Sequence, residues 1–99
     1  MSRRDILVTY DVNTETQEGR RRLRKIAQIC ENYGQRVQYS VFECSVTPVQ
    51  LEQLEHEVVS AMDKDEDSIR LYVLSGGREA ALRAYGRDRY VDFDAPLVI

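Results

Sequence analysis

The stretch Ile6-Leu7-Val8-Thr9-Tyr10, followed at once by Asp11, decides the fold of this chain. Its apolar, β-branched and aromatic residues predict a buried central strand that Asp11 ends. The carboxyl ends of buried strands are where α/β sheets place functional groups, so Asp11 is the first candidate site residue. Asp11 could instead start a turn, with its side chain accepting backbone N–H groups two residues on. The spacing alone favours these two interpretations about equally.

A helix is expected after this strand, over about Gln17 to Tyr33. Thr14, with Gln17 three residues later, resembles a helix-start signature, and Gly34 supplies a stop. The apolar residues between these points recur at helical spacing, and they are Leu23, Ile26, Ala27, Cys30 and Tyr33.

Three further elements follow. Apolar and polar residues alternate between Arg36 and Val46, which fits either one long strand or two strands that bend. A second helix is expected from Pro48 to Met62, because Thr47 and Gln50 form a capping pair and proline is tolerated at the first helical position. The apolar run from Ile69 to Leu74 predicts a strand that returns to the sheet.

The C-terminal part carries weaker patterns. Residues 78–85 could form a short helical stretch capped by Gly86, and the alternation from Tyr90 to Asp94 is typical of an edge strand. The predicted order is therefore β-α-β(β)-α-β with a C-terminal extension. This is the ferredoxin-like pattern of the α+β class, formed by a single domain over residues 1–99.

Composition limits the function classes. The chain has 99 residues, 42% of them hydrophobic, which is near the size where a domain folding alone becomes marginal and a second subunit would help. The net charge of −3 divides into +2 over residues 1–46 (8 basic, 6 acidic) and −5 over residues 47–99 (6 basic, 11 acidic). An anionic partner should therefore meet the N-terminal part.

Cellular context follows from cysteine usage and hydropathy. Cys30 and Cys44 are too few for a disulfide framework and are expected to be reduced and structural. No apolar run approaches the length of a membrane span, and the charged residues 1–5 do not resemble a signal peptide. We therefore expect a cytoplasmic protein.

A basic cluster marks the first predicted helix and consists of Arg20, Arg21, Arg22, Arg24 and Lys25. At about 100° per residue these side chains form a broad positive collar, which suits a phosphate backbone. The alternative is a solvated face balanced by neighbouring glutamates. Aromatic residues could stack on nucleobases, and the candidates are Tyr10, Tyr33, Tyr39 and Phe42.

Asp11 by itself is a poor metal site, because Mg²⁺ usually takes one or two carboxylates together with waters and substrate phosphate. A twofold axis close to this strand end would bring two copies of Asp11 together. The one histidine, His56, is expected on the solvated side of the second helix, without the ligand cluster that a zinc site needs.

Several blocks of residues resemble one known family. These blocks are residues 8–12, Arg22 to Ala27, Gly34 to Cys44 and, more weakly, residues 67–72 and 94–99. They are similar to the second of the two near-universal CRISPR adaptation proteins, Cas-two. The resemblance implies a homodimer in which residues 87–99 cross onto the sheet of the partner. It also implies a tight bend near Tyr39 and Ser40.

The same resemblance implies an activity and its residues. Members of that family are described as metal-dependent nucleases on RNA or double-stranded DNA, with Asp11 from both subunits at a Mg²⁺ or Mn²⁺ ion. Tyr10, Ser40 and Phe42 match the same catalytic block. The positions expected to bind nucleic acid are Arg20, Arg21, Arg22, Arg24, Lys25, Arg36 and Arg78.

Three hypotheses remain open from the sequence. The first is a phosphodiesterase built on paired Asp11 carboxylates, which acts in spacer acquisition. The second is a non-catalytic scaffold that holds duplex DNA and bridges dimers of the integrase Cas-one. The third is a small regulatory ferredoxin-like domain that senses a metabolite, for which the sequence shows no ligand pocket.

Overall fold

The computed structural model describes residues 3–74 and 82–86. The elements in chain order are β1 (Arg4–Asp11), α1 (Gln17–Glu31), β2 (Gly34–Gln38), β3 (Val41–Val46), α2 (Pro48–Ala61), β4 (Ser68–Val73) and β5 (Leu82–Gly86). The predicted C-terminal extension, residues 87–99, and the predicted edge strand from Tyr90 to Asp94 lie outside the described residues.

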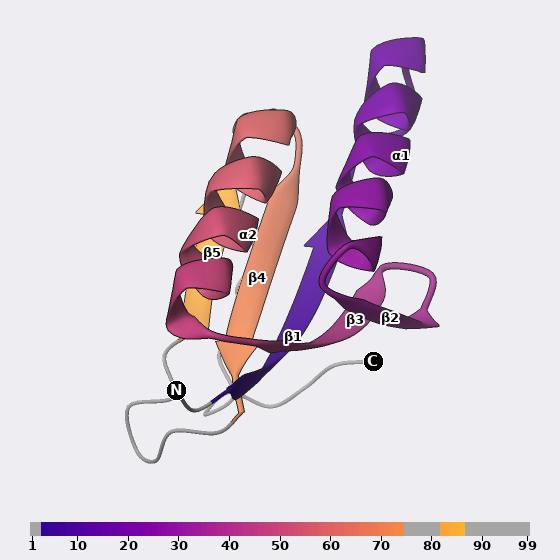
Figure 1. Cartoon of the computed structure of the whole chain (residues 1–99). Coiled ribbons are helices and arrows are strands. Elements are labelled where there is room, and N and C mark those ends of the chain that lie inside the picture. Colours follow the sequence, from indigo (N-terminus) through magenta and orange to yellow (C-terminus); the bar gives the residue numbers. More distant parts are fainter. Residues whose placement is uncertain (1–2, 75–81, 87–99) are drawn as a thin grey trace, which may run out of the picture.

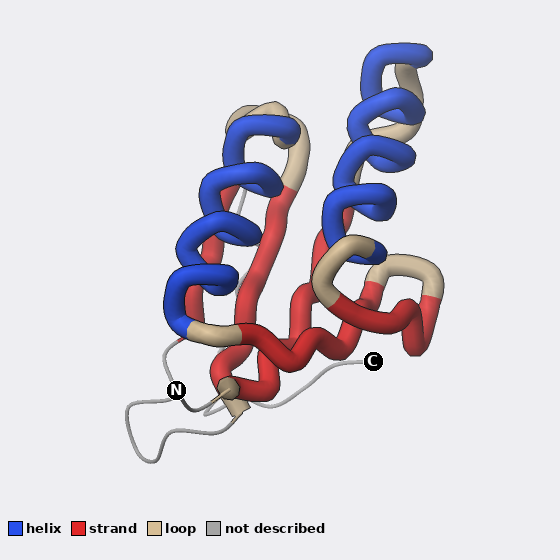
Figure 2. The backbone as a smooth tube through the Cα atoms, viewed as in Figure 1, coloured by secondary structure: helices blue, strands red, loops and turns tan. Residues whose placement is uncertain are grey.

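The strands form one antiparallel sheet in the order β2-β3-β1-β4-β5. As predicted, β1 is central, with β3 on one side and β4 on the other. Both helices lie on the same face of this sheet (Figures 1 and 2). A βαββαβ unit with one further strand beyond β4 is the ferredoxin-like α+β fold that the sequence predicts.

The core lies between the sheet and the two helices. Alternation along β1 buries Ile6, Val8 and Tyr10 and leaves Asp5 and Asp11 exposed. Each fully buried aliphatic side chain of this kind stabilises the fold by roughly 1.5–3 kcal/mol. The helices close the core with residues at helical spacing, which are Ile26, Ala27, Ile29, Cys30, Leu51, Leu54 and Val58.

The segment from Arg36 to Val46 is two strands, because Tyr39 and Ser40 form a turn between β2 and β3. The bend that the family resemblance implies is therefore confirmed. The β2–β3 register shifts between Arg36 and Gln38, which is a bulge at the end of β2.

The ends of α1 differ from the prediction. The N-terminal cap is Thr16 and not Thr14, since the Thr16 side chain accepts from the backbone N–H of Gly19. The helix ends at Glu31, and Gly34 is not its stop. A Cβ at Gly34 would lie 2.0 Å from the Glu43 carbonyl oxygen, so this glycine allows β2 to approach β3 closely.

The second capping pair is confirmed, because Thr47 and Gln50 form a complete capping box at the start of α2, with Pro48 in the first turn. The helical stretch predicted for residues 78–85 is wrong where the structure describes it, since residues 82–86 form β5. The free edge of β4 offers backbone partners that outweigh a weak local helical pattern. Gly86 ends this strand with a φ of 86°, a conformation that favours glycine.

Cys30 and Cys44 are buried and free, as expected. Burial raises the pKa of the Cys30 thiol to about 12 and that of the Cys44 thiol to about 11. Neither α1 nor α2, the helices of the described part, is long and apolar enough to span a membrane.

Candidate functional site

Asp11 is exposed at the last position of β1, where it pairs with Ser68 of β4. The turn that follows uses a different residue: the Asn13 side chain accepts the backbone N–H of Glu15 at 2.9 Å. The Asx turn weighed for Asp11 therefore belongs to Asn13. Asp11 stands at the edge of two hollows, one on the helix side of the sheet and one towards Thr9 and Arg70.

The hollow on the helix side, of about 350 Å³, collects predicted site residues from three parts of the chain. Asp11 comes from β1, Arg24 from α1, and Arg36 and Ser40 from the β2–β3 hairpin. The hollow is therefore lined by one acidic and two arginine residues, and guanidinium groups can hold a phosphate. We call this space the Asp11 hollow.

Tyr10 and Phe42 lie beneath the Asp11 hollow. Phe42 is 0% exposed and Tyr10 is 5% exposed, and their rings stack with centroids 6.2 Å apart. The side-chain alternation of β3 turns the Phe42 ring into the core, so its burial gives no support to the predicted action of Phe42 on a substrate. The Tyr10 hydroxyl donates to the Tyr39 carbonyl at 3.3 Å, and burial raises the pKa of Tyr10 above its usual value. Both rings support the hairpin from within.

Arg36 is oriented by its neighbours but stays accessible. Its guanidinium carbon lies 5.2 Å from the centroid of the Phe42 ring, a cation–π geometry. Its Nη2 lies 4.0 Å from a Glu31 carboxylate oxygen, and 45% of its side chain is exposed. Arg36 can therefore present a positioned positive charge to a ligand in the Asp11 hollow.

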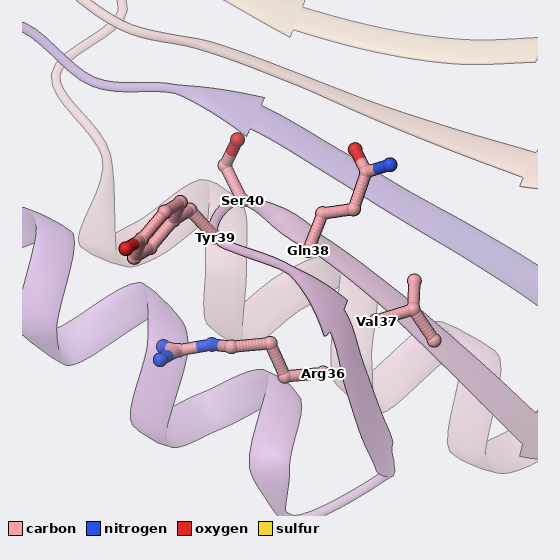
Figure 3. A pocket seen from close by; sticks show the side chains of 5 residues that line it. All are labelled: Arg36, Val37, Gln38, Tyr39 and Ser40. Atoms are coloured by element: carbon pink, nitrogen blue, oxygen red, sulfur yellow. The ribbon is translucent and has the colours of Figure 1, made fainter.

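The hairpin turn carries the remaining predicted site residue, Ser40. The Ser40 carbonyl accepts the Tyr10 backbone N–H at 3.1 Å, which ties the turn to β1. Figure 3 shows the Tyr39 and Arg36 side chains extending in one direction and the Gln38 and Ser40 side chains in another. The Ser40 side chain is half-buried.

The arginine-rich collar divides into groups with different tasks. Arg20, Arg21 and Arg24 are exposed, and the Arg20 guanidinium also donates to the Thr14 carbonyl at 3.1 Å. Lys25 is exposed as well, but it lines a groove between α1 and α2 beside His56, away from Asp11. Arg78 lies outside the described residues.

Arg22 differs from the exposed collar residues, because Asp67 binds its guanidinium group, and this geometry gives no support to the predicted contact with nucleic acid. Its Nε lies 2.7 Å and its Nη2 3.2 Å from the two carboxylate oxygens of Asp67, which is fully buried. The backbone N–H groups of Asn13 and Asp63 also donate to this carboxylate, at 3.1 and 2.9 Å. Asp67 therefore joins α1, the loop after β1 and the loop after α2.

Asp67 is the residue that the sequence patterns missed. Burial alone would raise its pKa, but the hydrogen bonds from Arg22 and from the Asp63 and Asn13 backbones outweigh burial and lower it. Its neighbour Ser68 is the cross-strand partner of Asp11, so Asp67 helps to fix the end of β1. The available signal was an acid directly before a buried strand, hidden in the acidic run from residue 63.

A metal site within one chain does not fit the described residues. They contain no group of three or more histidine, cysteine or acidic side chains that could hold an ion. Asp11 supplies one exposed carboxylate. A Mg²⁺ ion bound by two carboxylates would therefore need Asp11 from two chains.

Comparisons with known proteins agree on one family. A family model described as CRISPR associated protein Cas2 matches residues 4–80. A relative named CRISPR-associated endoribonuclease Cas2 1, from Moorella thermoacetica, is 52% identical over 94 residues, which cover 95% of this chain and 98% of the relative. A relative named CRISPR-associated endonuclease Cas2, from Halalkalibacterium halodurans, is 44% identical over 93 residues, which cover 94% and 97%. The crystal structure of Streptococcus pyogenes Cas2 superposes with a TM-score of 0.68 at 56% identity, covering 72% of this chain and 86% of that one.

Proposed function

The chain belongs to the Cas2 family of CRISPR-associated proteins, and on that premise we propose that it is a homodimeric, metal-dependent nuclease of CRISPR adaptation. The relatives are named endoribonuclease or endonuclease, which supports phosphodiester hydrolysis as the reaction. Family membership leaves the metabolite-sensing hypothesis without support. A cytoplasmic location stays a prediction.

One observation carries this proposal: Asp11, Arg24 and Arg36 line a single hollow at the end of the central strand. The two guanidinium groups would grip the non-bridging oxygens of a phosphate and hold it beside the Asp11 carboxylate. Arg36 is held in place by Glu31 and by the Phe42 ring, so little of its side-chain freedom would be lost on binding.

A second chain would complete the acidic part of the site. Asp11 also borders the hollow lined by Thr9, Ser68, Arg70 and Tyr72, on the face of the sheet that α1 and α2 do not cover (Figure 1). Packing two such faces about a twofold axis would place two Asp11 carboxylates close to that axis. The proposed crossing of residues 87–99 onto the partner stays a prediction.

Paired Asp11 carboxylates would hold Mg²⁺ or Mn²⁺, which when bound polarises the phosphate and makes a water molecule acidic enough to attack it. The contribution of the chain is to place the phosphate with Arg24 and Arg36. Asp11 contributes an exposed side chain at the end of β1, where a second chain can reach it.

The test compares Asp11→Asn with Asp5→Asn, a control at the exposed opposite end of the same strand. Both variants and the wild type are assayed on single-stranded RNA and duplex DNA, with Mg²⁺ and with chelator. We expect hydrolysis to disappear in Asp11→Asn and in chelator, and to persist in Asp5→Asn. Equal hydrolysis by both variants would exclude the Asp11 site.

A second function, a scaffold that holds duplex DNA for the integrase Cas-one, is favoured by the exposed Arg20 and Arg21. Neither residue lines the Asp11 hollow, so both can contact phosphates without serving hydrolysis. Changing both to Gln should flatten the salt dependence of duplex binding by roughly 0.9 per lost phosphate contact. The control is Lys64→Gln, which removes an exposed charge from the acidic turn. An unchanged slope in the double variant argues against the scaffold surface.

A further inference from the structure

The backbone at Tyr39 is hydrogen-bonded to the central strand, whereas the Tyr39 ring is exposed. Its carbonyl accepts the Tyr10 hydroxyl at 3.3 Å, and the next carbonyl, that of Ser40, accepts the Tyr10 N–H at 3.1 Å. These bonds fix the turn against the central strand. The Tyr39 residue is nevertheless 94% exposed, the highest value among the exposed large hydrophobic residues of the described chain. Packing among the described residues therefore does not explain the ring.

A shallow hollow of about 740 Å³ lies against this turn, lined by Arg36, Val37, Gln38, Tyr39 and Ser40 (Figure 3). Val37 also lines this hollow and is 47% exposed, so the hollow has an exposed aliphatic side chain as well as an aromatic one. The Arg36 and Tyr39 side chains extend from the hairpin in the same direction (Figure 3). A flat aromatic ligand that carries a phosphate could contact the Val37 side chain, stack on the Tyr39 ring and place its phosphate at the Arg36 guanidinium group.

We infer that Tyr39 is a stacking platform for one unpaired nucleobase of the nucleic acid whose phosphate enters the Asp11 hollow. Tyr39, Arg36 and Ser40 line both hollows, so the two spaces adjoin at the hairpin. A base stacked on Tyr39 would place its own phosphate or the adjoining one beside Arg36. That phosphate then lies within the space that Asp11 and Arg24 also line.

This inference deepens the proposed function, on which it rests, by assigning Tyr39 to the recognition of an unpaired base, in a single strand or in the unpaired tail of a duplex. Bases inside a duplex have both faces covered by their neighbours, so they cannot stack on a side chain without first leaving the helix. An unpaired base has a free face and stacks on an aromatic ring whatever its sequence.

The test measures the affinity of three proteins for two probes: a blunt DNA duplex, and the same duplex with a single-stranded tail that contains 2-aminopurine. The proteins are wild type, Tyr39→Leu, which keeps an apolar side chain without a π face, and Tyr39→Trp, which keeps the face. The control, Leu74→Ala, removes another exposed apolar side chain, 61% exposed, beyond the other end of β4. Because Tyr39 is so exposed and has no positive φ, both substitutions should leave the fold intact.

We expect Tyr39→Leu to weaken binding of the tailed probe by about 5- to 100-fold and to abolish the quenching of 2-aminopurine. Tyr39→Trp and Leu74→Ala should retain both, and all four proteins should bind the blunt duplex alike. Equal effects of Tyr39→Leu on the two probes would overturn the inference. A change only in the concentration dependence of dimer formation would also overturn it, and would assign Tyr39 to a contact between copies.

Hydrolysis of the same probes, measured in parallel, separates this inference from the proposed function. If wild type hydrolyses a probe with Mg²⁺ while Tyr39→Leu binds and cuts as wild type does, the stacking platform fails and the nuclease stands. If Tyr39→Leu loses the tail preference and no protein hydrolyses any probe, the nuclease fails and the platform stands.

Discussion

Replacing Asp67 with Asn should be among the most damaging single changes in the described fold. The Asp67 carboxylate is fully buried and accepts four hydrogen bonds: two from Arg22, at 2.7 and 3.2 Å, and one each from the backbones of Asp63 and Asn13. Asparagine keeps the shape but loses the charge, and it turns an amide NH₂ towards N–H donors. Removing one partner of such a buried pair costs about 3–5 kcal/mol of unfolding free energy.

For a domain of this size, that loss lowers the melting temperature by at least about 12 °C. The assay is thermal and urea unfolding of Asp67→Asn at one fixed protein concentration, because dimer formation would otherwise shift the midpoint. Asp65→Asn is the control, since it makes the same change at an exposed neighbour. Arg22→Met, alone and combined with Asp67→Asn, completes a double-mutant cycle. A loss below about 1 kcal/mol for Asp67→Asn, or strictly additive effects, would refute the reasoning.

The pH dependence of unfolding gives a second check on Asp67. Its hydrogen bonds hold its pKa below the ordinary value of 3.8, even though burial acts in the opposite direction. A carboxyl group whose pKa is lowered by folding stabilises the protein fully above its unfolded pKa, and this contribution is lost as the pH falls through the folded pKa. Wild type should therefore lose stability below about pH 4 more steeply than Asp67→Asn does.

Three further predictions concern the stability of the fold around the site. Burial raises the pKa of the Cys30 thiol to about 12 and that of the Cys44 thiol to about 11, so alkylation of these thiols at neutral pH should proceed only through unfolding. Alkylation of the native protein at the rate of a free thiol would contradict this prediction. Gly34→Ala should lower the free energy of unfolding, measured by urea titration, by about 1–3 kcal/mol, because its Cβ would lie 2.0 Å from the Glu43 carbonyl oxygen. An unchanged free energy of unfolding would show that the strands can separate. Thr47→Ala should lose about 1 kcal/mol in the same assay through loss of the capping box, and Thr47→Ser should recover most of it.

Sequence patterns correctly predicted the helices and strands that are determined by residues close together in the chain. The apolar run ending at Asp11 gave the central strand, and the Thr47–Gln50 pair gave the start of α2, because neighbouring residues decide both. The prediction failed for residues 82–86, where the free edge of β4 decides the structure and lies far away in the sequence. The predicted role of Phe42 lacks structural support for a related reason: the family resemblance points to this aromatic residue, but only the sheet shows that its side chain is buried.

The helix geometry behind the arginine collar shows where sequence reasoning about the site ends. Arg22 and Arg24 are separated by about 200° around α1, so if one turns towards the loops behind β1, the other turns away. Only the fold reveals that the buried Asp67 lies on the side of Arg22 and that Asp11 lies on the side of Arg24. Chemically identical residues two positions apart thus stabilise the domain in one case and line the candidate site in the other. An Arg22 variant that loses nucleic-acid binding would therefore report unfolding, whereas charge neutralisation at the exposed Arg20, Arg21, Arg24 or Arg36 tests binding itself.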